Sequence, residues 1–92
     1  MKPVNWNAEK NIRLKAERGV SFEEVMSAIS NDGLLHALDH PNTDQYPNQR
    51  MLVVRIRGYA YLVPLVETEH EVFLKTIIPS RKATRIYLIE EP

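Results

Sequence analysis

The sequence predicts an α+β fold: an antiparallel β-sheet of about four strands, with two N-terminal helices on one face and a short C-terminal helix. Three observations indicate this class. Two capped helical segments come first, strand-like segments follow with short connections, and a further capped segment lies near the C-terminus. The 92 residues have the length of one compact domain, so residues 1–92 are expected to form a single unit without internal repeats.

The first helix is expected after a short extended segment, Val4–Trp6. Asn7 is a suitable N-cap, because its side-chain oxygen can accept a hydrogen bond from a free backbone N–H. The helix should run over residues 8–18 and end at Gly19, which can adopt a left-handed conformation. We expect Trp6 to anchor the N-terminal segment on the core.

The second helix is predicted from "SFEE" onward. Ser21 and Glu24 have the spacing of a capping box, in which each side chain bonds the other residue's backbone N–H. Apolar residues then repeat at the helical period until about Ser30, namely Phe22, Val25, Met26 and Ile29.

The strands are expected in the second half of the chain. Residues 34–41 read as a short extended segment, and a polar loop follows. The clearest hairpin pairs residues 50–56 with residues 59–66 through a tight turn at Arg57-Gly58. Alternation places Arg55 on the face opposite to Leu52, Val54 and Ile56. Pro64 should end the second strand early or form a bulge, because it has no N–H to donate.

The C-terminal part is predicted as one strand over residues 72–78, stopped by Pro79, followed by a short helix capped by Ser80. We expect this helix to pack Ile86, Tyr87 and Leu88 back on the domain.

Composition restricts the possible chemistry. The chain has no cysteine, no metal-binding motif and no glycine-rich phosphate loop, so no metal and no cofactor is predicted. No apolar run approaches the roughly 20 residues that span a bilayer, and the N-terminus lacks a signal-peptide segment, so we expect no membrane association and a cytoplasmic protein. The three histidines are interpreted as loop or strand-end residues.

Charge is segregated along the chain although the net charge is zero. Arg81, Lys82 and Arg85 form the densest cationic cluster, at a helix start where positive charge opposes the helix dipole. The free N–H groups at residues 80–82 and these cations would bind phosphate. The simpler alternative is a solvated face making ion pairs worth about 0–1 kcal/mol each. We expect Lys10 or Lys15 to share one side of the sheet with Arg55 and Arg81, with Glu23 and Glu24 on the other side.

Three segments resemble the BrnT-like toxins of bacterial type II toxin–antitoxin modules. They are "NWNAEKN" at 5–11, "RGVSFEEV" at 18–25 and "IIPSRKATRIY" at 77–87. Together they cover both ends of the chain in the family's order. The resemblance implies a RelE-like fold, metal-independent RNA cleavage, and neutralisation by a ribbon-helix-helix-like antitoxin with which the toxin represses its operon. Two positions depart from the family pattern: Arg18 stands where a histidine is common, and Tyr87 where a glutamate is common.

The resulting hypothesis is a toxin-like endoribonuclease. Arg55 and Arg81 are predicted to stabilise the phosphorane, and Tyr87 is the candidate base, with Lys10 or Lys15 as alternatives. The residues expected to bind the RNA backbone are Lys10, Lys15, Arg18, Lys75, Lys82 and Arg85. The alternative is a degenerate, non-catalytic module that binds the antitoxin and takes part in operon repression. The assembly stays open between a homodimer and a heterotetramer with the antitoxin.

Overall fold

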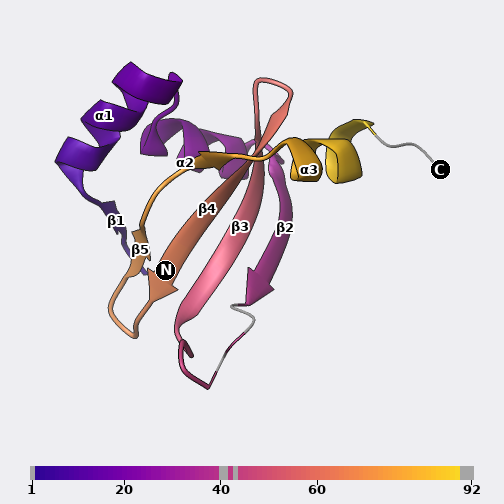
Figure 1. The fold of residues 1–92 in the computed structure, drawn as a ribbon. Helices are drawn as coiled ribbons and strands as arrows, with labels where there is room; N and C mark the ends of the chain where they lie inside the picture. The colour runs from indigo at the N-terminus through magenta and orange to yellow at the C-terminus, as the bar shows by residue number, and fades with distance from the viewer. Residues whose placement is uncertain (1, 40–41, 43, 90–92) are drawn as a thin grey trace.

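A computed structural model describes residues 2–39, 42 and 44–89 of the chain. The elements follow the order β1 (Val4–Trp6), α1 (Ala8–Arg18), α2 (Phe22–Ser30), β2 (Leu34–Asp39), β3 (Gln49–Ile56), β4 (Tyr59–Glu67), β5 (Val72–Leu74), β6 (Ile78–Pro79), α3 (Arg81–Thr84) and a π-helical turn, η1 (Arg85–Ile89). The α+β class with two N-terminal helices and a short C-terminal helix is confirmed (Figure 1).

The sheet differs from the prediction in strand number and in one direction. Six strands pair in the order β1-β5-β4-β3-β2, and β6 pairs with β4 beside that path. The extended opening β1 joins the sheet parallel to β5, so the sheet is mixed and not purely antiparallel. This pairing joins residues almost seventy positions apart, and no local pattern in three residues of sequence specifies it.

The predicted helix caps are confirmed. Asn7 accepts a hydrogen bond from the N–H of Lys10, and Gly19 adopts φ 69° at the end of α1. Ser21 accepts from the N–H of Glu24 at the start of α2, and Ser80 accepts from the N–H of Ala83 at the start of α3. Each cap involves residues at most four positions apart, which is why the sequence alone predicts them.

The hairpin turn also agrees with the prediction. Arg57 and Gly58 both have positive φ, 50° and 78°, as a two-residue turn of type I′ requires. The expected effect of Pro64 is wrong, because β4 continues through it to Glu67. The carbonyl of Pro64 accepts from the N–H of Lys75, so its missing N–H faces the interval between β5 and β6. Residue 64 lies between the stretch of β4 that pairs with β5 and the stretch that pairs with β6, so the missing N–H interrupts neither pairing.

The two faces of the sheet carry separate hydrophobic clusters. On the first, here called the α1–α2 face, the side chains of Val54, Ile56 and Val63 pack with Phe22 and Leu14 from the helices. Trp6 stacks on Phe22 with ring centroids 5.5 Å apart, which agrees with its expected anchoring role.

On the opposite side, here called the α3 face, Val53 and Ala60 pack with Ala83 and Leu88. Figure 1 shows the chain after β5 crossing the front of β4 before it forms α3. The expected strand over residues 72–78 is therefore split, since β6 pairs with a different part of β4. Leu88 packs as predicted, but Ile86 and Tyr87 are 47% and 39% exposed, so their expected burial is wrong.

Candidate functional site

The C-terminal helix is fixed to the sheet by one buried threonine. The N–H of Ala60 donates to Thr84 Oγ1 at 2.8 Å, and the Thr84 hydroxyl donates to the Ser80 carbonyl at 2.8 Å. The N–H of Ser80 completes the connection by donating to the Ala60 carbonyl. Ala60 lies opposite Arg55 in the β3–β4 ladder. The same contacts therefore place Arg55 beside α3 on the α3 face.

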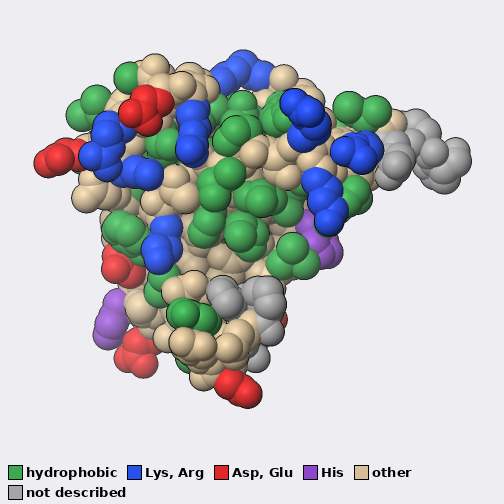
Figure 2. Space-filling view, viewed as in Figure 1, with side chains coloured by type: hydrophobic (Ala, Val, Ile, Leu, Met, Phe, Trp, Pro, Cys, Tyr) green, Lys and Arg blue, Asp and Glu red, His purple; other side chains and the backbone are tan. Residues whose placement is uncertain are grey.

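Cations gather around this helix without acidic neighbours. Arg81, Lys82 and Arg85 are exposed, and Figure 2 shows Lys and Arg side chains clustered over the C-terminal helical segment. The Arg55 guanidinium donates to the Asp32 carbonyl at 3.2 Å. Among the residues that the structure describes, none of these four cations has a carboxylate within 4.0 Å, whereas Lys2, Lys15, Arg50 and Arg57 all do. Their charge is available to an external anion.

The helix start itself contributes little. The α3 helix has only four residues, and the Ser80 cap already occupies the N–H of Ala83. A single turn has a small dipole, so the cost of placing Arg81 and Lys82 there is small. The backbone N–H groups at residues 80–82 are therefore expected to add little to anion binding, which depends on the charged side chains.

A histidine that the sequence analysis passed over lies beside the predicted catalytic tyrosine. His36 stands opposite Val53 in the β2–β3 ladder, which puts it on the α3 face. Its ring stacks on that of Tyr87, with centroids 5.9 Å apart and an interplanar angle of 25°. The strand alternation of "LLHALD" was the available signal, but only the register of β2 shows which face His36 occupies.

The cations of α1 lie elsewhere. Leu14 packs α1 against the α1–α2 face, and Lys15 lies 3.8 Å from Glu23 of α2. The expectation that Lys10 or Lys15 shares a side of the sheet with Arg55 and Arg81, opposite Glu23 and Glu24, is therefore wrong. The two helices pack together on one face, so their charges stay together.

The remaining predicted RNA-binding residues have local contacts. Arg18 Nη1 donates to the carbonyl of Ile77, which ties the end of α1 to the segment before β6. Lys75 is exposed, and its backbone N–H bonds the Pro64 carbonyl. Neither residue lines a cavity that also contains Tyr87.

An apolar trough extends from the C-terminal helix along the α3 face. The ladder aligns Leu38 with Met51 and Pro64, one row beyond His36, Val53 and Leu62. A cavity of about 530 Å³ is lined by Leu38, Met51, Leu62 and Pro64 together with Asp39, Gln49 and Arg50. A second cavity of about 200 Å³ shares Leu38 and Leu62 with it. The second cavity reaches Lys82, Ile86 and Tyr87. Figure 2 shows hydrophobic side chains on this face below the cations.

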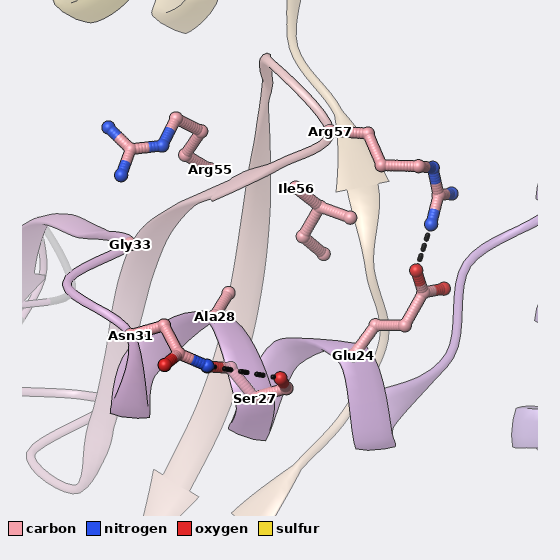
Figure 3. A pocket seen from close by; sticks show the side chains of 8 residues that line it. All are labelled: Glu24, Ser27, Ala28, Asn31, Gly33, Arg55, Ile56 and Arg57. Atoms are coloured by element: carbon pink, nitrogen blue, oxygen red, sulfur yellow. Dashed lines mark hydrogen bonds and ion pairs between the residues drawn. The ribbon is translucent and has the colours of Figure 1, made fainter.

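A further pocket, of about 250 Å³, lies between the end of α2 and β3 (Figure 3). Its polar groups are paired with one another: Arg57 with Glu24, and Asn31 with Ser27. Figure 3 shows Arg55 and Ile56 extending from opposite sides of β3. Arg55 also lines this pocket, where its guanidinium donates to the Asp32 carbonyl and has no carboxylate partner among the described residues. The other charged groups of the lining, Arg57 and Glu24, neutralise each other.

The junction of α1 and α2 holds a carboxylate with a shifted pKa. Buried Asn11 accepts a hydrogen bond from the N–H of Phe22 and donates to Glu23 Oε1, both at 2.8 Å. The hydrogen bond from Asn11 is the main cause that lowers the pKa of Glu23 below its ordinary value of 4.5, and the positive charge of Lys15 adds to it.

We expect acid to weaken this junction. Because the pKa of Glu23 is lowered in the folded protein, its stabilising contribution is complete above the unfolded value and is lost as the pH falls through the folded value. The free energy of unfolding should therefore exceed that of Glu23→Gln by more at pH 7 than at about pH 3. Urea denaturation measures both, with Glu17→Gln as an exposed control on α1. A pH-independent difference would contradict this role of Glu23.

None of the described helices is long and apolar enough to cross a membrane. Within the described residues, His, Asp and Glu side chains form no group of three that could hold a metal ion.

Comparison with known proteins adds no relative. No protein-family model, no curated protein and no solved structure matches the chain.

Proposed function

We propose that this chain is the toxin component of a type II toxin–antitoxin module, an endoribonuclease that cleaves RNA in the cytoplasm without a metal ion. The observation that carries the proposal is the set of cations on the α3 face, Arg55, Arg81, Lys82 and Arg85, of which Lys82 lines the same cavity as Tyr87. These cations have no carboxylate partner in the described part of the chain. The resemblance of "IIPSRKAT" and the two N-terminal segments to BrnT-like toxins supports the same assignment.

The proposed chemistry needs positive charge more than any other property. Attack of a ribose 2′-hydroxyl on the adjacent phosphate forms a phosphorane that carries extra negative charge, and fixed cations lower its energy. Arg and Lys also bind the flanking phosphates with little dependence on sequence. The apolar trough lies next to these cations, where the bases of a single strand can be covered.

A cleavage assay tests the proposal directly. Labelled single-stranded RNA should be cut in the presence of EDTA, leaving a 2′,3′-cyclic phosphate and a 5′-hydroxyl. A DNA strand of the same sequence is the matched control, because it lacks the attacking 2′-hydroxyl. Equal cleavage of DNA, or cleavage only with added metal, would contradict the mechanism. Intact RNA under all conditions would contradict the enzymatic function.

The second candidate is a non-catalytic module that binds a ribbon-helix-helix-like antitoxin and assists operon repression. The apolar trough favours it, because Leu38 is 43% exposed at the junction of the two cavities. A partner with an apolar stripe and acidic flanks would match the trough and its cationic border. Wild-type binding without RNA cleavage would favour this candidate over the enzyme.

Leu38→Asp should weaken antitoxin binding by at least about fivefold, the loss expected when a contact worth more than 1 kcal/mol is removed. Its melting temperature should fall less than that of a core variant, since 43% of Leu38 is exposed. Ile12→Asp is the matched control, because Ile12 is 65% exposed on α1, away from the trough. Calorimetry with a candidate ribbon-helix-helix antitoxin provides the affinities. Equal affinities for both variants would exclude the trough as the docking surface.

A further inference from the structure

The stacked pair of His36 and Tyr87 has the features of a reactive site more than of a packing contact. Both residues reach the surface, with 39% of Tyr87 accessible to solvent. The two rings come from elements far apart in sequence, β2 and η1, and meet at a centroid distance of 5.9 Å. The stack therefore presents an imidazole and a phenol to the solvent side by side.

Cations lie on the same face as the pair, although the cavity of Tyr87 is lined mainly by apolar side chains. Lys82 lines the same cavity as Tyr87, Arg85 opens η1, and Arg55 lies on the same face of β3. The described carboxylate nearest along the strand, Asp39, is held by Arg50, and no described acid pairs with His36. A phosphate bound by Lys82 in this cavity would lie beside Tyr87, the ring on which His36 stacks.

Given the proposed ribonuclease function, we infer that His36 and Tyr87 are the proton-transfer pair of the RNA cleavage site. Neutral His36 takes the proton from the ribose 2′-hydroxyl, and the oxygen forms a bond to phosphorus. The bond from phosphorus to the 5′-oxygen breaks, and the leaving oxygen takes the proton of the Tyr87 hydroxyl. Proton transfer from the imidazolium to the tyrosinate, directly or through water, restores both groups.

The assignment suits the chemistry of the two side chains. An imidazole gains and loses a proton between about pH 5 and 8, which makes it the side chain most suited to act as a base near neutral pH. The stack holds the imidazole of His36 against the ring of Tyr87, which belongs to the same helical segment as Lys82 and Arg85. Phosphate binding and proton transfer are thereby placed on one surface.

A substrate with sulfur in place of the scissile 5′-oxygen separates the two roles, because a thiolate leaves without needing a proton. His36→Asn should cut both the oxygen and the sulfur substrate about 10²–10⁴-fold more slowly than wild type. Tyr87→Phe keeps the ring stack, and should be slow on the oxygen substrate but close to wild type on the sulfur substrate. The rise of kcat/KM between about pH 5 and 8 should disappear in His36→Asn.

His70→Asn is the matched control, because His70 lies in the β4–β5 connection, where it pairs with Glu69. It should behave as wild type on both substrates. Melting temperature and affinity for an uncleavable 2′-deoxy strand should stay unchanged in all three variants. Wild-type cleavage by His36→Asn would overturn its role as base, and an equal loss on both substrates in Tyr87→Phe would overturn its role as acid. Failure of the wild type to cut any RNA would instead overturn the proposed function itself.

Discussion

Lys82→Ala is expected to lower RNA cleavage by about 10²–10³-fold, the loss typical of one preorganised transition-state donor. Lys82 lines the cavity that also contains Tyr87, so its ammonium group is the cation placed to stabilise the phosphorane. It is exposed, and the substitution should change the free energy of unfolding by no more than about 0.5 kcal/mol. Single-turnover cleavage and melting temperature measure the two effects.

Arg81→Ala is the neighbouring comparison. Sequence analysis favours Arg81 as the phosphorane-stabilising cation and Lys82 as a backbone contact, but Arg81 does not line the cavity of Tyr87. Arg81→Ala should therefore weaken RNA binding without slowing the bond-breaking step. The overall cleavage rate should fall by about tenfold or less. Arg13→Ala on α1 should have no effect. A larger loss of cleavage in Arg81→Ala than in Lys82→Ala would contradict this assignment. It would favour Arg81, the residue predicted from sequence, as the cation that stabilises the phosphorane.

The features predicted correctly from sequence are those set by nearby residues. Asn7, Ser21 and Ser80 each cap a helix through a residue three positions ahead. The Arg57-Gly58 turn fixes the register of the β3–β4 hairpin, so the side of the sheet that Arg55 occupies also followed. In each case the deciding interaction lies within the segment itself.

The features missed depend on pairings between distant segments. The contact of His36 with Tyr87 requires the register of β2 on β3 and the path of the chain from β6 to η1. Likewise, the sequence shows that α1 carries lysines, but it does not show on which side of the sheet those lysines lie. The prediction placed both helices on one face of the sheet, and their packing in one cluster with Val54 and Ile56 shows that this face is the one opposite to α3 and Arg55. Charge segregation along a chain therefore does not by itself indicate segregation in space.

Thr84→Val is expected to lower the free energy of unfolding by about 1–3 kcal/mol, the cost of leaving a buried donor without a partner. Valine has nearly the shape of threonine but cannot accept the hydrogen bond from the N–H of Ala60, a residue with no exposed surface. The donation to the Ser80 carbonyl is lost with it. Urea denaturation of the two proteins measures the difference.

The same substitution should also lower RNA cleavage, because Thr84 is the residue that fixes the cationic helix on β4. The loss should appear at temperatures well below the unfolding transition, as a local loosening of α3 relative to Arg55. Thr84→Ser is the matched control: it keeps the hydroxyl and both hydrogen bonds, and should retain most of the activity and stability. If Thr84→Val were as stable and as active as Thr84→Ser, the hydroxyl would not be what holds α3 in place. The position of Lys82 beside Tyr87 would then depend on the hydrogen bond from Ser80 to the Ala60 carbonyl and on the apolar contacts of Ala83 and Leu88.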